Sequence, residues 1–226
     1  MRLATFNVKH ALLAGLDAIA VALRESRAEV IALQEVDRGA RRSGGVDQAR
    51  ALGERLGMAW AFAKAMDHDG GEYGCALLLT PALSGPDLRS TSVPLPGGGG
   101  PGEEPRVLLR AHAAGLRIFV SHLDLPAAVR PAQADAIAKA IGDPQGSVLL
   151  CDCNEAVTGP AVRRLLALPL RDAWAEAAAP ERPTAPGDRP QERIDLVLLG
   201  PGVPAARTAR AIDTGASDHP LVVVEL

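Results

Sequence analysis

The chain has few cysteines and few aromatic residues. Three of its 226 residues are cysteine, and Cys151 and Cys153 stand too close together on one expected strand to form an ordinary disulfide bond. The cysteines also lack the spacing of a structural zinc site. A cytoplasmic protein with reduced thiols is the simplest interpretation. Aromatic residues make up 3% of the sequence, which argues against extensive base stacking along a single nucleic-acid strand.

Long apolar runs and an excess of positive charge are also missing. No apolar run approaches the roughly 20 residues that a membrane-spanning helix needs, so we expect no membrane segment. The net charge is −3 at pH 7, so there is no broad basic field to attract polyanions. Apolar residues form 47% of the chain, which is ample for a large core. We expect residues 1–226 to form a single domain and to be monomeric.

Short apolar runs alternate with helical patterns along the chain. Residues 2–8, 30–33 and 147–150 are typical of buried strands, and the helical periodicity of residues 12–27 lies between the first two. This spacing predicts a strand–helix–strand crossover of an α/β fold. Further helices are expected at 47–56 with Asp47 as the cap, at 127–141 and near 161–168. Further strands are expected at 59–63, 73–79, 106–113, 116–123, 193–199, 205–211 and 221–226.

Two segments rich in glycine and proline interrupt this pattern. Residues 84–105 have almost no periodicity and predict a loop of uncommon length, either a mobile rim or an insertion. Residues 180–190 predict a second proline-rich loop. Strand patterns resume directly after the first loop, so neither segment indicates a domain boundary.

Polar side chains recur where the apolar strands end. Carboxylate and amide oxygens suit a hard cation such as Mg²⁺ or Mn²⁺, and histidines without thiolate partners suit proton transfer or phosphate contact. So many polar strand ends in one chain indicate an active site. The residues are Asn7, Glu35, His122, Asp124, Asp152, Asn154, Asp195, Asp218 and His219.

Taken singly, most of these residues have a simpler structural interpretation. Burial of an unpaired carboxylate is costly, which makes Asp195 on its apolar strand the hardest to explain in this way. The simpler interpretations are a turn for Asn7 and for Asp218-His219-Pro220, a solvated strand end for Glu35, a core histidine for His122, a helix cap for Asp124, an Asx-type strand end for Asp152 with Asn154, and a solvated strand face for Arg106, which could alternatively bind substrate phosphate.

Seven short motifs contain these residues and follow one another in this order: Thr5-Phe6-Asn7-Val8, Leu33-Gln34-Glu35-Val36-Asp37, Tyr73-Gly74-Cys75-Ala76-Leu77, Ser121-His122-Leu123-Asp124, Cys151-Asp152-Cys153-Asn154, Arg193-Ile194-Asp195 and Ser217-Asp218-His219-Pro220. The motifs and their order resemble the endonuclease/exonuclease/phosphatase superfamily over essentially the whole chain. The resemblance implies a deoxyribonuclease I-like α/β (α+β) fold. In this fold, two mixed β-sheets form a four-layer α/β/β/α sandwich and the site lies where the strand ends converge.

The resemblance also implies a role for each matching residue. Metal ligation of Mg²⁺ falls to Glu35, with Asn7 beside it and Asp218 as a further acidic ligand. Catalysis and substrate binding fall to Asp152, which orients or deprotonates the attacking water; Asn154, which binds phosphate; His219, held by Asp195, as base or charge stabiliser; His122, which contacts phosphate or the leaving group; and Tyr73, whose hydroxyl lies near phosphate.

Four positions depart from the family pattern, and one of them is Ala185, where phenylalanine is common. Many relatives carry asparagine at Cys75 and glycine at Cys151, and some nucleases carry an acidic residue at Lys9, so the number of metal ions is open. We predict a Mg²⁺-dependent phosphoesterase that acts by direct water attack on a small phosphoester, or a lipid or sugar phosphate. A nuclease acting on DNA or RNA is the first alternative, although Arg38, Arg41 and Arg42 form the only dense basic cluster near a motif. A non-catalytic interaction module that retains the fold is the second.

Overall fold

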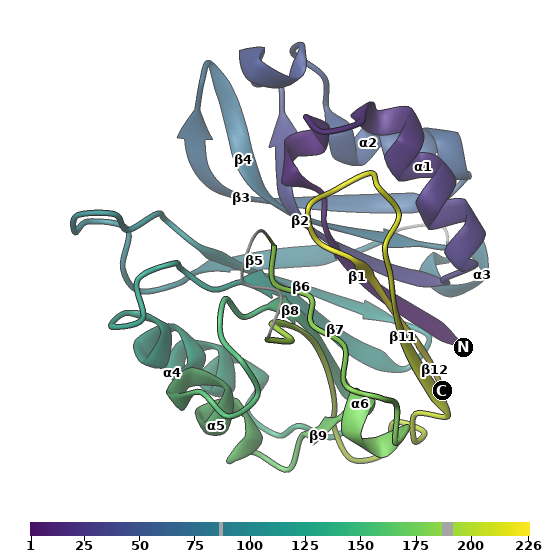
Figure 1. Ribbon diagram of the computed structural model, residues 1–226, viewed down its shortest axis with the longest axis vertical. Helices are drawn as coiled ribbons and strands as arrows, with labels where there is room; N and C mark the ends of the chain where they lie inside the picture. The colour runs from purple at the N-terminus through teal and green to yellow at the C-terminus, as the bar shows by residue number, and fades with distance from the viewer. Residues whose placement is uncertain (86–87, 187–191) are drawn as a thin grey trace.

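The computed structural model describes residues 1–85, 88–186 and 192–226. Two six-stranded mixed sheets pack face to face, and helices cover the outer face of each sheet (Figure 1). This arrangement confirms the predicted four-layer sandwich. Within the described residues, no helix is long and apolar enough to cross a membrane.

The first sheet has the strand order β11-β12-β1-β2-β4-β3. Its strands are β1 (Arg2–Asn7), β2 (Val30–Arg38), β3 (Ala59–His68), β4 (Gly71–Leu79), β11 (Thr208–Ile212) and β12 (Leu221–Glu225). The parallel pair β1 and β2 is joined through α1 (Gly15–Ser26), as the predicted crossover requires. The other helical segments of this half are η1 (Lys9–Ala11), η2 (Arg41–Ser43), α2 (Gln48–Leu56) and α3 (Pro81–Ser84).

The second sheet has the order β5-β6-β7-β8-β10-β9. Its strands are β5 (Ser90–Pro94), β6 (Val107–Ala113), β7 (Leu116–His122), β8 (Ser147–Asp152), β9 (Arg171–Asp172) and β10 (Asp195–Leu199). The parallel pair β7 and β8 is joined through α4 (Arg130–Ile141), so this half repeats the crossover of the first. Two further helices are α5 (Pro160–Leu166) and α6 (Ala173–Glu176).

Both faces of the central strands are buried. In β2, Val30 and Ala32 point into the core between the sheets, whereas Ile31 and Leu33 point into the core beneath α1 and α2. A third core lies between the second sheet and helices α4 and α5. A strand buried on both faces has an unbroken apolar sequence, which is why these strands could be predicted from short apolar runs.

Local signals placed several elements correctly. Asp47 caps α2 by accepting a hydrogen bond from the backbone N–H of Arg50 at 3.0 Å. The two strands predicted at 106–113 and 116–123, β6 and β7, form a hairpin through Ala114 and Gly115, which both have positive φ. Helix α5 begins at Pro160, close to the start of the helix predicted near 161–168, because proline suits the first helical position.

Other predicted boundaries were wrong. The expected loop 84–105 contains the edge strand β5. Residues 86–87 of this loop lie outside the described part of the chain. Among the described strands, β5 pairs with β6 alone and is mostly exposed, so it needs no apolar alternation and shows none in its sequence. Strand β2 continues past Leu33 to Arg38 through a bulge, and helix α1 starts at Gly15 rather than at residue 12. In the expected loop 180–190, residues 187–190 lie outside the described part.

The sheet topology brings the polar strand ends to one edge. Strands β7 and β8 are parallel and end side by side at His122 and Asp152. Strand β10 runs antiparallel to β8, so its first residue, Asp195, lies at the same edge. In the other sheet, β12 runs antiparallel to β1, which places the segment before β12 near the end of β1 at Asn7.

Candidate active site

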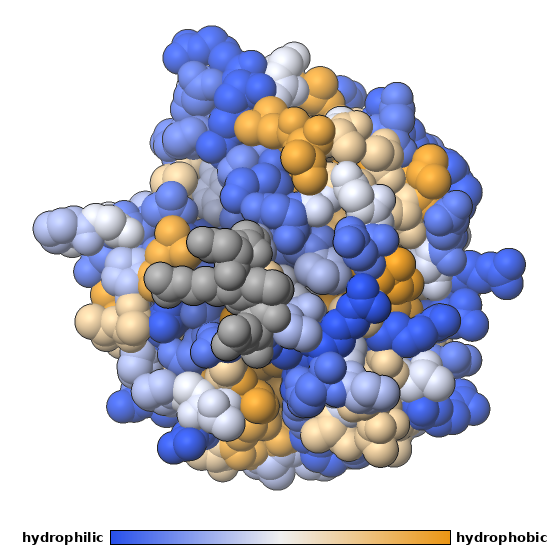
Figure 2. All heavy atoms as spheres, viewed as in Figure 1, coloured by the Kyte–Doolittle hydropathy of each residue, from blue (hydrophilic) through white to orange (hydrophobic). Residues whose placement is uncertain are grey.

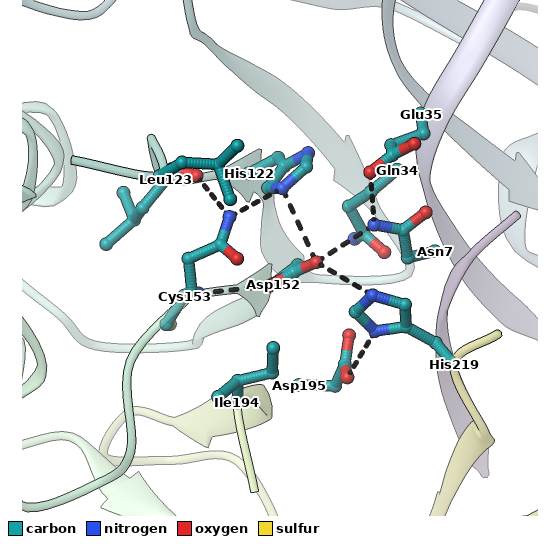
Figure 3. Close-up of polar contacts among 12 residues, drawn as sticks. Asn7, Gln34, Glu35, His122, Leu123, Asp152, Cys153, Ile194, Asp195 and His219 are labelled. Atoms are coloured by element: carbon teal, nitrogen blue, oxygen red, sulfur yellow. Dashed lines mark hydrogen bonds and ion pairs between the residues drawn. The ribbon is translucent and has the colours of Figure 1, made fainter. Parts of the chain in front are cut away.

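Three of the predicted residues form a row across the second sheet. His122, Asp152 and Asp195 are register partners on the neighbouring strands β7, β8 and β10. Each side chain is buried, and Figure 3 shows all three converging with residues from the first sheet. The close approach of segments that are far apart in the sequence therefore follows from strand pairing.

His219 joins this row from the segment before β12. Its Nδ1 lies 3.0 Å from Asp195 Oδ2, and its Nε2 lies 3.8 Å from Asp152 Oδ2 (Figure 3). The Ser217 hydroxyl donates to the backbone oxygen of Asn7 at 2.6 Å, which fixes this segment against β1. Burial lowers the pKa of His219, but the charges of Asp195 and Asp152 outweigh it and raise that pKa to about 9.

Asp152 is the centre of the hydrogen-bond network. Its Oδ2 accepts from Asn7 Nδ2 at 3.0 Å and its Oδ1 accepts from the backbone N–H of Asn154 at 3.0 Å. Burial and the charge of Asp195 raise the pKa of Asp152 to about 7, although His219 and these hydrogen bonds act in the opposite direction. The second oxygen of Asp195, Oδ1, is buried and has no hydrogen-bond partner among the residues that the structure describes. The site therefore concentrates negative charge that its own donors only partly neutralise.

His122 is enclosed by four polar neighbours. Its Nδ1 lies 3.1 Å from Arg106 Nη1 and 3.5 Å from the Tyr73 hydroxyl, and its Nε2 lies 2.9 Å from Asn154 Nδ2. The same Nε2 is 3.4 Å from Asp152 Oδ2. Burial and the positive charge of Arg106 lower the pKa of His122 well below its ordinary value, so the ring is neutral at pH 7.

Asn154 leaves the strand direction. Strand β8 ends at Asp152, and Asn154 has a positive φ of 47°. Its backbone N–H bonds to Asp152, and its Nδ2 donates to the backbone oxygen of Leu123 at 2.9 Å. Asn154 is therefore both an Asx-type strand end and a site residue, because the turn directs its side-chain amide toward His122. Cys151 and Cys153 are buried in the core between the second sheet and helices α4 and α5.

Glu35 lies at a bulge in β2. The register with β4 shifts between Leu33 and Val36, and Glu35 itself has a positive φ of 55°. Its Oε1 accepts from Asn7 Nδ2 at 2.9 Å. Burial favours a raised pKa, but His10, His122 and the Asn7 amide outweigh it and hold the pKa of Glu35 well below its ordinary value. The bulge thus turns an ionised carboxylate toward the site.

Arg106 is not on a solvated strand face, as one interpretation of the sequence suggested. It is 4% exposed and donates from Nη1 to the Tyr73 hydroxyl at 2.9 Å. Its Nη2 lies 2.9 Å from Glu104 Oε2 and 3.4 Å from Asp124 Oδ1. Burial of a guanidinium needs partners from separate segments, which the sequence pattern of one strand does not reveal.

Asp124 does not cap α4, so that expectation was wrong. The helix begins at Arg130, and its N-cap residue, Val129, makes no side-chain capping bond. Asp124 is instead fully buried and accepts from the backbone N–H groups of Glu104 and Leu125. It therefore fixes the loop that carries Glu104 beside the site.

The Asp218 carboxylate pairs with Lys9. Its Oδ2 binds Lys9 Nζ at 2.8 Å, and both side chains are partly exposed. The ammonium group of Lys9 thus neutralises the carboxylate that the resemblance implied as a further metal ligand. Where the resemblance places an acidic residue in some nucleases, this chain has the positively charged Lys9.

The oxygen donors around Asn7 fit a hard divalent cation. The amide Nδ2 of Asn7 lies between Glu35 Oε1 and Asp152 Oδ2, so carboxylates from the two sheets converge on one point. Carboxylate oxygens are the ligands that Mg²⁺ and Mn²⁺ prefer. Asp152, Asp195 and His219 also offer ligand atoms within 4.8 Å of one another. A hydrogen bond already joins Asp195 to His219, so that set fits a cation less well.

A cavity of about 190 Å³ opens at this point. Sequence reasoning missed His10, which lines the cavity three residues after Asn7 and is one of only five histidines in the chain. It noted Arg42 only as part of a basic cluster. The cavity is lined by Asn7, Lys9, His10, Glu35, Arg42, Met66, His68, Tyr73, Glu104, Arg106, His122, Leu125, Asp152, Asn154, Pro186 and His219.

The backbone beside the cavity is strained. Lys9, His10 and Ala11 have φ values of 48°, 56° and 56°, so three successive side-chain-bearing residues adopt left-handed conformations. Such a conformation costs roughly 1–2 kcal/mol per residue. Strain of this kind persists where surrounding contacts impose it, and it clusters at functional sites.

Comparisons with known proteins agree with this arrangement. The sequence profile of the Endonuclease/Exonuclease/phosphatase family matches residues 4–219. No curated protein matches the chain by sequence. The structure is similar to that of an endonuclease/exonuclease/phosphatase from Beutenbergia cavernae DSM 12333, with a TM-score of 0.76 and 23% identity, covering 99% of this chain and 70% of that one.

Two further solved structures share the fold. The mannosyl-6-phosphatase Bt3783 of Bacteroides thetaiotaomicron VPI-5482 has a TM-score of 0.73 and 18% identity, over 100% of this chain and 98% of that one. The catalytic domain of human Nocturnin, solved with a bound sulfate anion, has a TM-score of 0.72 and 20% identity, over 99% of this chain and 92% of that one.

Proposed function

Because the chain belongs to the endonuclease/exonuclease/phosphatase family, hydrolytic enzymes that act on phosphate esters, we propose that it hydrolyses a small phosphoester with the help of a divalent metal ion. The observation that supports this most strongly is the convergence of Glu35, Asp152 and His219 on one cavity. Acids from two sheets meet there with imidazoles from the end of β7 and from the segment before β12, which is the set of groups that hydrolysis of a phosphate ester requires.

We assign Mg²⁺, or Mn²⁺, to Glu35 with Asn7 beside it. The Asp152 carboxylate shares the Asn7 amide with Glu35, so it lies next to the same position. When bound, the ion would neutralise phosphate oxygens and the charge that develops on the leaving alkoxide. Asp218 is a weaker candidate ligand because Lys9 binds its carboxylate.

Asp152 is our candidate for orienting and deprotonating the attacking water. A general base must be able to lose and regain a proton near the working pH, and the pKa of Asp152 is raised to about 7. Its Oδ2 faces the cavity among Asn7, His122 and His219. Direct attack by this water would need no covalent enzyme intermediate.

His219 is our candidate for stabilising charge on the phosphorane. The Asp195 carboxylate holds its Nδ1, so the proton on that nitrogen is fixed and Nε2 is left for the reacting groups. With a pKa raised to about 9, the ring is cationic at pH 7, which favours charge stabilisation over the role of a base.

His122 and Asn154 are our candidates for contact with the phosphate or the leaving group. His122 is neutral and buried, and Asn154 shares a hydrogen bond with it, so the two move together. Tyr73 is 4% exposed and bonds to Arg106, so we assign it to holding His122 and Arg106 rather than to the phosphate. Arg106, whose Nη1 and Nη2 groups already have protein partners, is likewise assigned to positioning rather than substrate binding.

The cavity favours a small substrate. Its volume of about 190 Å³ admits a phosphate group and part of a leaving group. Leu125 lines the cavity with 62% of its surface exposed, which offers an apolar contact to an organic leaving group. Figure 2 shows hydrophilic side chains over most of the visible face, with apolar groups between them. The similarity to a mannosyl-6-phosphatase supports a sugar phosphate as one member of this substrate class.

A nuclease remains a second candidate because Lys9, Arg42 and His68 line the cavity and could bind successive phosphates. One assay panel separates the candidates. Hydrolysis of p-nitrophenyl phosphate, bis(p-nitrophenyl) phosphate, mannose 6-phosphate, plasmid DNA and abasic DNA is measured with and without Mg²⁺. We expect Mg²⁺-dependent hydrolysis of the small esters, and its loss in His219→Ala but not in His112→Ala, which alters an exposed histidine.

Each other result has a definite meaning. Nicking of DNA that falls steeply with salt concentration, without turnover of the small esters, would identify a nuclease. Hydrolysis of none of the substrates would favour a non-catalytic interaction module. Full activity in His219→Ala would contradict the role proposed for that histidine.

A further inference from the structure

His10 contacts the carboxylate that we assign to the metal ion, yet the proposed chemistry gives it no role. Its Nε2 lies 3.0 Å from Glu35 Oε2, the oxygen that Asn7 does not bind. The imidazole is 14% exposed and lies in the left-handed turn after β1. The chain thus adopts a strained conformation at the point where this ring meets Glu35.

Arg42 determines which nitrogen of His10 carries the proton. Its Nη2 lies 2.9 Å from His10 Nδ1, and a guanidinium group can only donate hydrogen bonds. In the neutral ring Nδ1 must therefore accept, so the ring proton resides on Nε2 and points at Glu35; a cationic ring also carries a proton on Nε2. The carboxylate of Asp37 is 3.6 Å from Nδ1, which is beyond hydrogen-bond distance.

Asp37 holds Arg42 in this position. The fully buried carboxylate accepts from Arg42 Nε at 2.9 Å and from Nη2 at 2.7 Å, a bidentate pair. The buried side chain of Gln48 ties the two segments together. It accepts from the backbone N–H of Asp37 at 2.9 Å and donates to the backbone oxygen of His10.

We propose that His10 is a positioning residue for Glu35. Its Nε2–H holds one oxygen of the Glu35 carboxylate, and the Arg42–Asp37 pair fixes the imidazole tautomer that makes this bond possible. Outer partners of this kind orient metal-binding carboxylates and strengthen metal affinity. The inference rests on the proposed function, because it requires Glu35 to bind the divalent ion.

The test is the affinity for Mg²⁺ alone, measured by calorimetry without substrate. Loss of an outer partner typically weakens metal binding about 10–100-fold, and we expect this for His10→Ala. His10→Gln can place an amide N–H near Glu35 and should regain most of the affinity. Arg42→Ala should weaken binding because the imidazole proton is no longer fixed. Matched controls are His112→Ala and Arg41→Ala; Arg41 is exposed and pairs with Asp69.

The outcomes distinguish this inference from the proposed function. If the wild-type chain binds no Mg²⁺, the proposed metal site fails. If the wild type binds Mg²⁺ and both His10→Ala and Arg42→Ala bind it equally well, only the positioning role of His10 is overturned. If His10→Gln binds as weakly as His10→Ala, the role as a hydrogen-bond donor is wrong. Circular dichroism of each variant checks the fold. If His10→Ala does not fold, the Mg²⁺ affinities of the single variants His10→Gln and Arg42→Ala test the positioning role.

Discussion

Asp152 and Asp195 are directly paired residues on the antiparallel strands β8 and β10, and both carboxylates are buried. Like charges that face each other in this way repel, and the charge of Asp195 is one reason why the pKa of Asp152 rises to about 7. The pair is stable only because other groups share its charge. His219 binds Asp195, and Asn7 binds Asp152.

Asp195→Asn should lower activity and move its pH dependence. The neutral amide no longer stabilises the His219 imidazolium, so we expect the rate to fall at least about 100-fold. Removal of the facing charge also lowers the pKa of Asp152, so the acidic limb of the kcat/KM profile should move to lower pH. The profile is measured from pH 4 to pH 9. An unchanged limb would contradict the coupling, and Asp67→Asn, at an exposed position, is the control.

The metal-free protein should lose stability as pH rises. The pKa of Asp152 is raised from 3.8 to about 7, so the folded chain keeps a proton that the unfolded chain releases within this window. The pKa of His219 is raised from 6.5 to about 9, so its contribution is full below pH 6.5 and is lost as pH rises through 9. Both effects lower the free energy of unfolding as pH rises.

Urea unfolding in EDTA at pH 5, 7 and 9 measures this trend. We expect the midpoint to fall from pH 5 to pH 9 in the wild type, and to fall less in Asp195→Asn. The depressed pKa values of Glu35 and Asp37 act below this range. The lowered pKa of His122 acts in the opposite direction below about pH 6.5, so the fall should be clearest between pH 7 and pH 9. A urea midpoint that rises with pH would show that Asp152 and His219 do not dominate the pH dependence of folding.

Lys9→Ala should strengthen Mg²⁺ binding. The ammonium group lies 2.8 Å from Asp218 Oδ2 and adds positive charge near Glu35, so its removal leaves more negative charge for a cation. The side chain is about half exposed, and solvent and salt therefore limit the effect to a few-fold. Calorimetry at low salt gives the affinity and the number of ions bound. Weaker binding in Lys9→Ala would be the contrary result.

Gly74→Ala should destabilise the sheet beside Tyr73. A Cβ atom at Gly74 would collide with the backbone oxygen of Ala63, opposite the irregularity between Lys64 and Met66 in β3. Overpacking against backbone typically costs about 1–3 kcal/mol. Urea unfolding gives the free energy of unfolding. Gly99→Ala, where a Cβ meets nothing within 4 Å, is the control, and equal stability of the two variants would argue against the collision.

Much of the fold and several site residues could be predicted from the sequence because buried strands have recognisable apolar runs. His122, Asp152 and Asp195 all lie at strand ends on one edge, as their positions along the sequence implied. Strand β5 could not be found, because an exposed edge strand has no apolar alternation.

The remaining features depend on contacts between distant segments. The burial of Arg106 needs Tyr73, Glu104 and Asp124 around it, and no pattern within β6 records them. The bulge at Glu35 and the left-handed turn at His10 are imposed by partners elsewhere in the chain. Lys9 was noticed as an unusual residue, but its bond to Asp218 could not be predicted.

If the proposed function is right, one cation and one phosphate share the cavity between the two sheets. Diffraction from crystals soaked with Mn²⁺ and inorganic phosphate, recorded at the manganese edge, tests this directly. We predict an anomalous peak bound by Glu35, with phosphate beside His122, Asn154 and His219. A peak bound elsewhere, or phosphate remote from these three side chains, would contradict it.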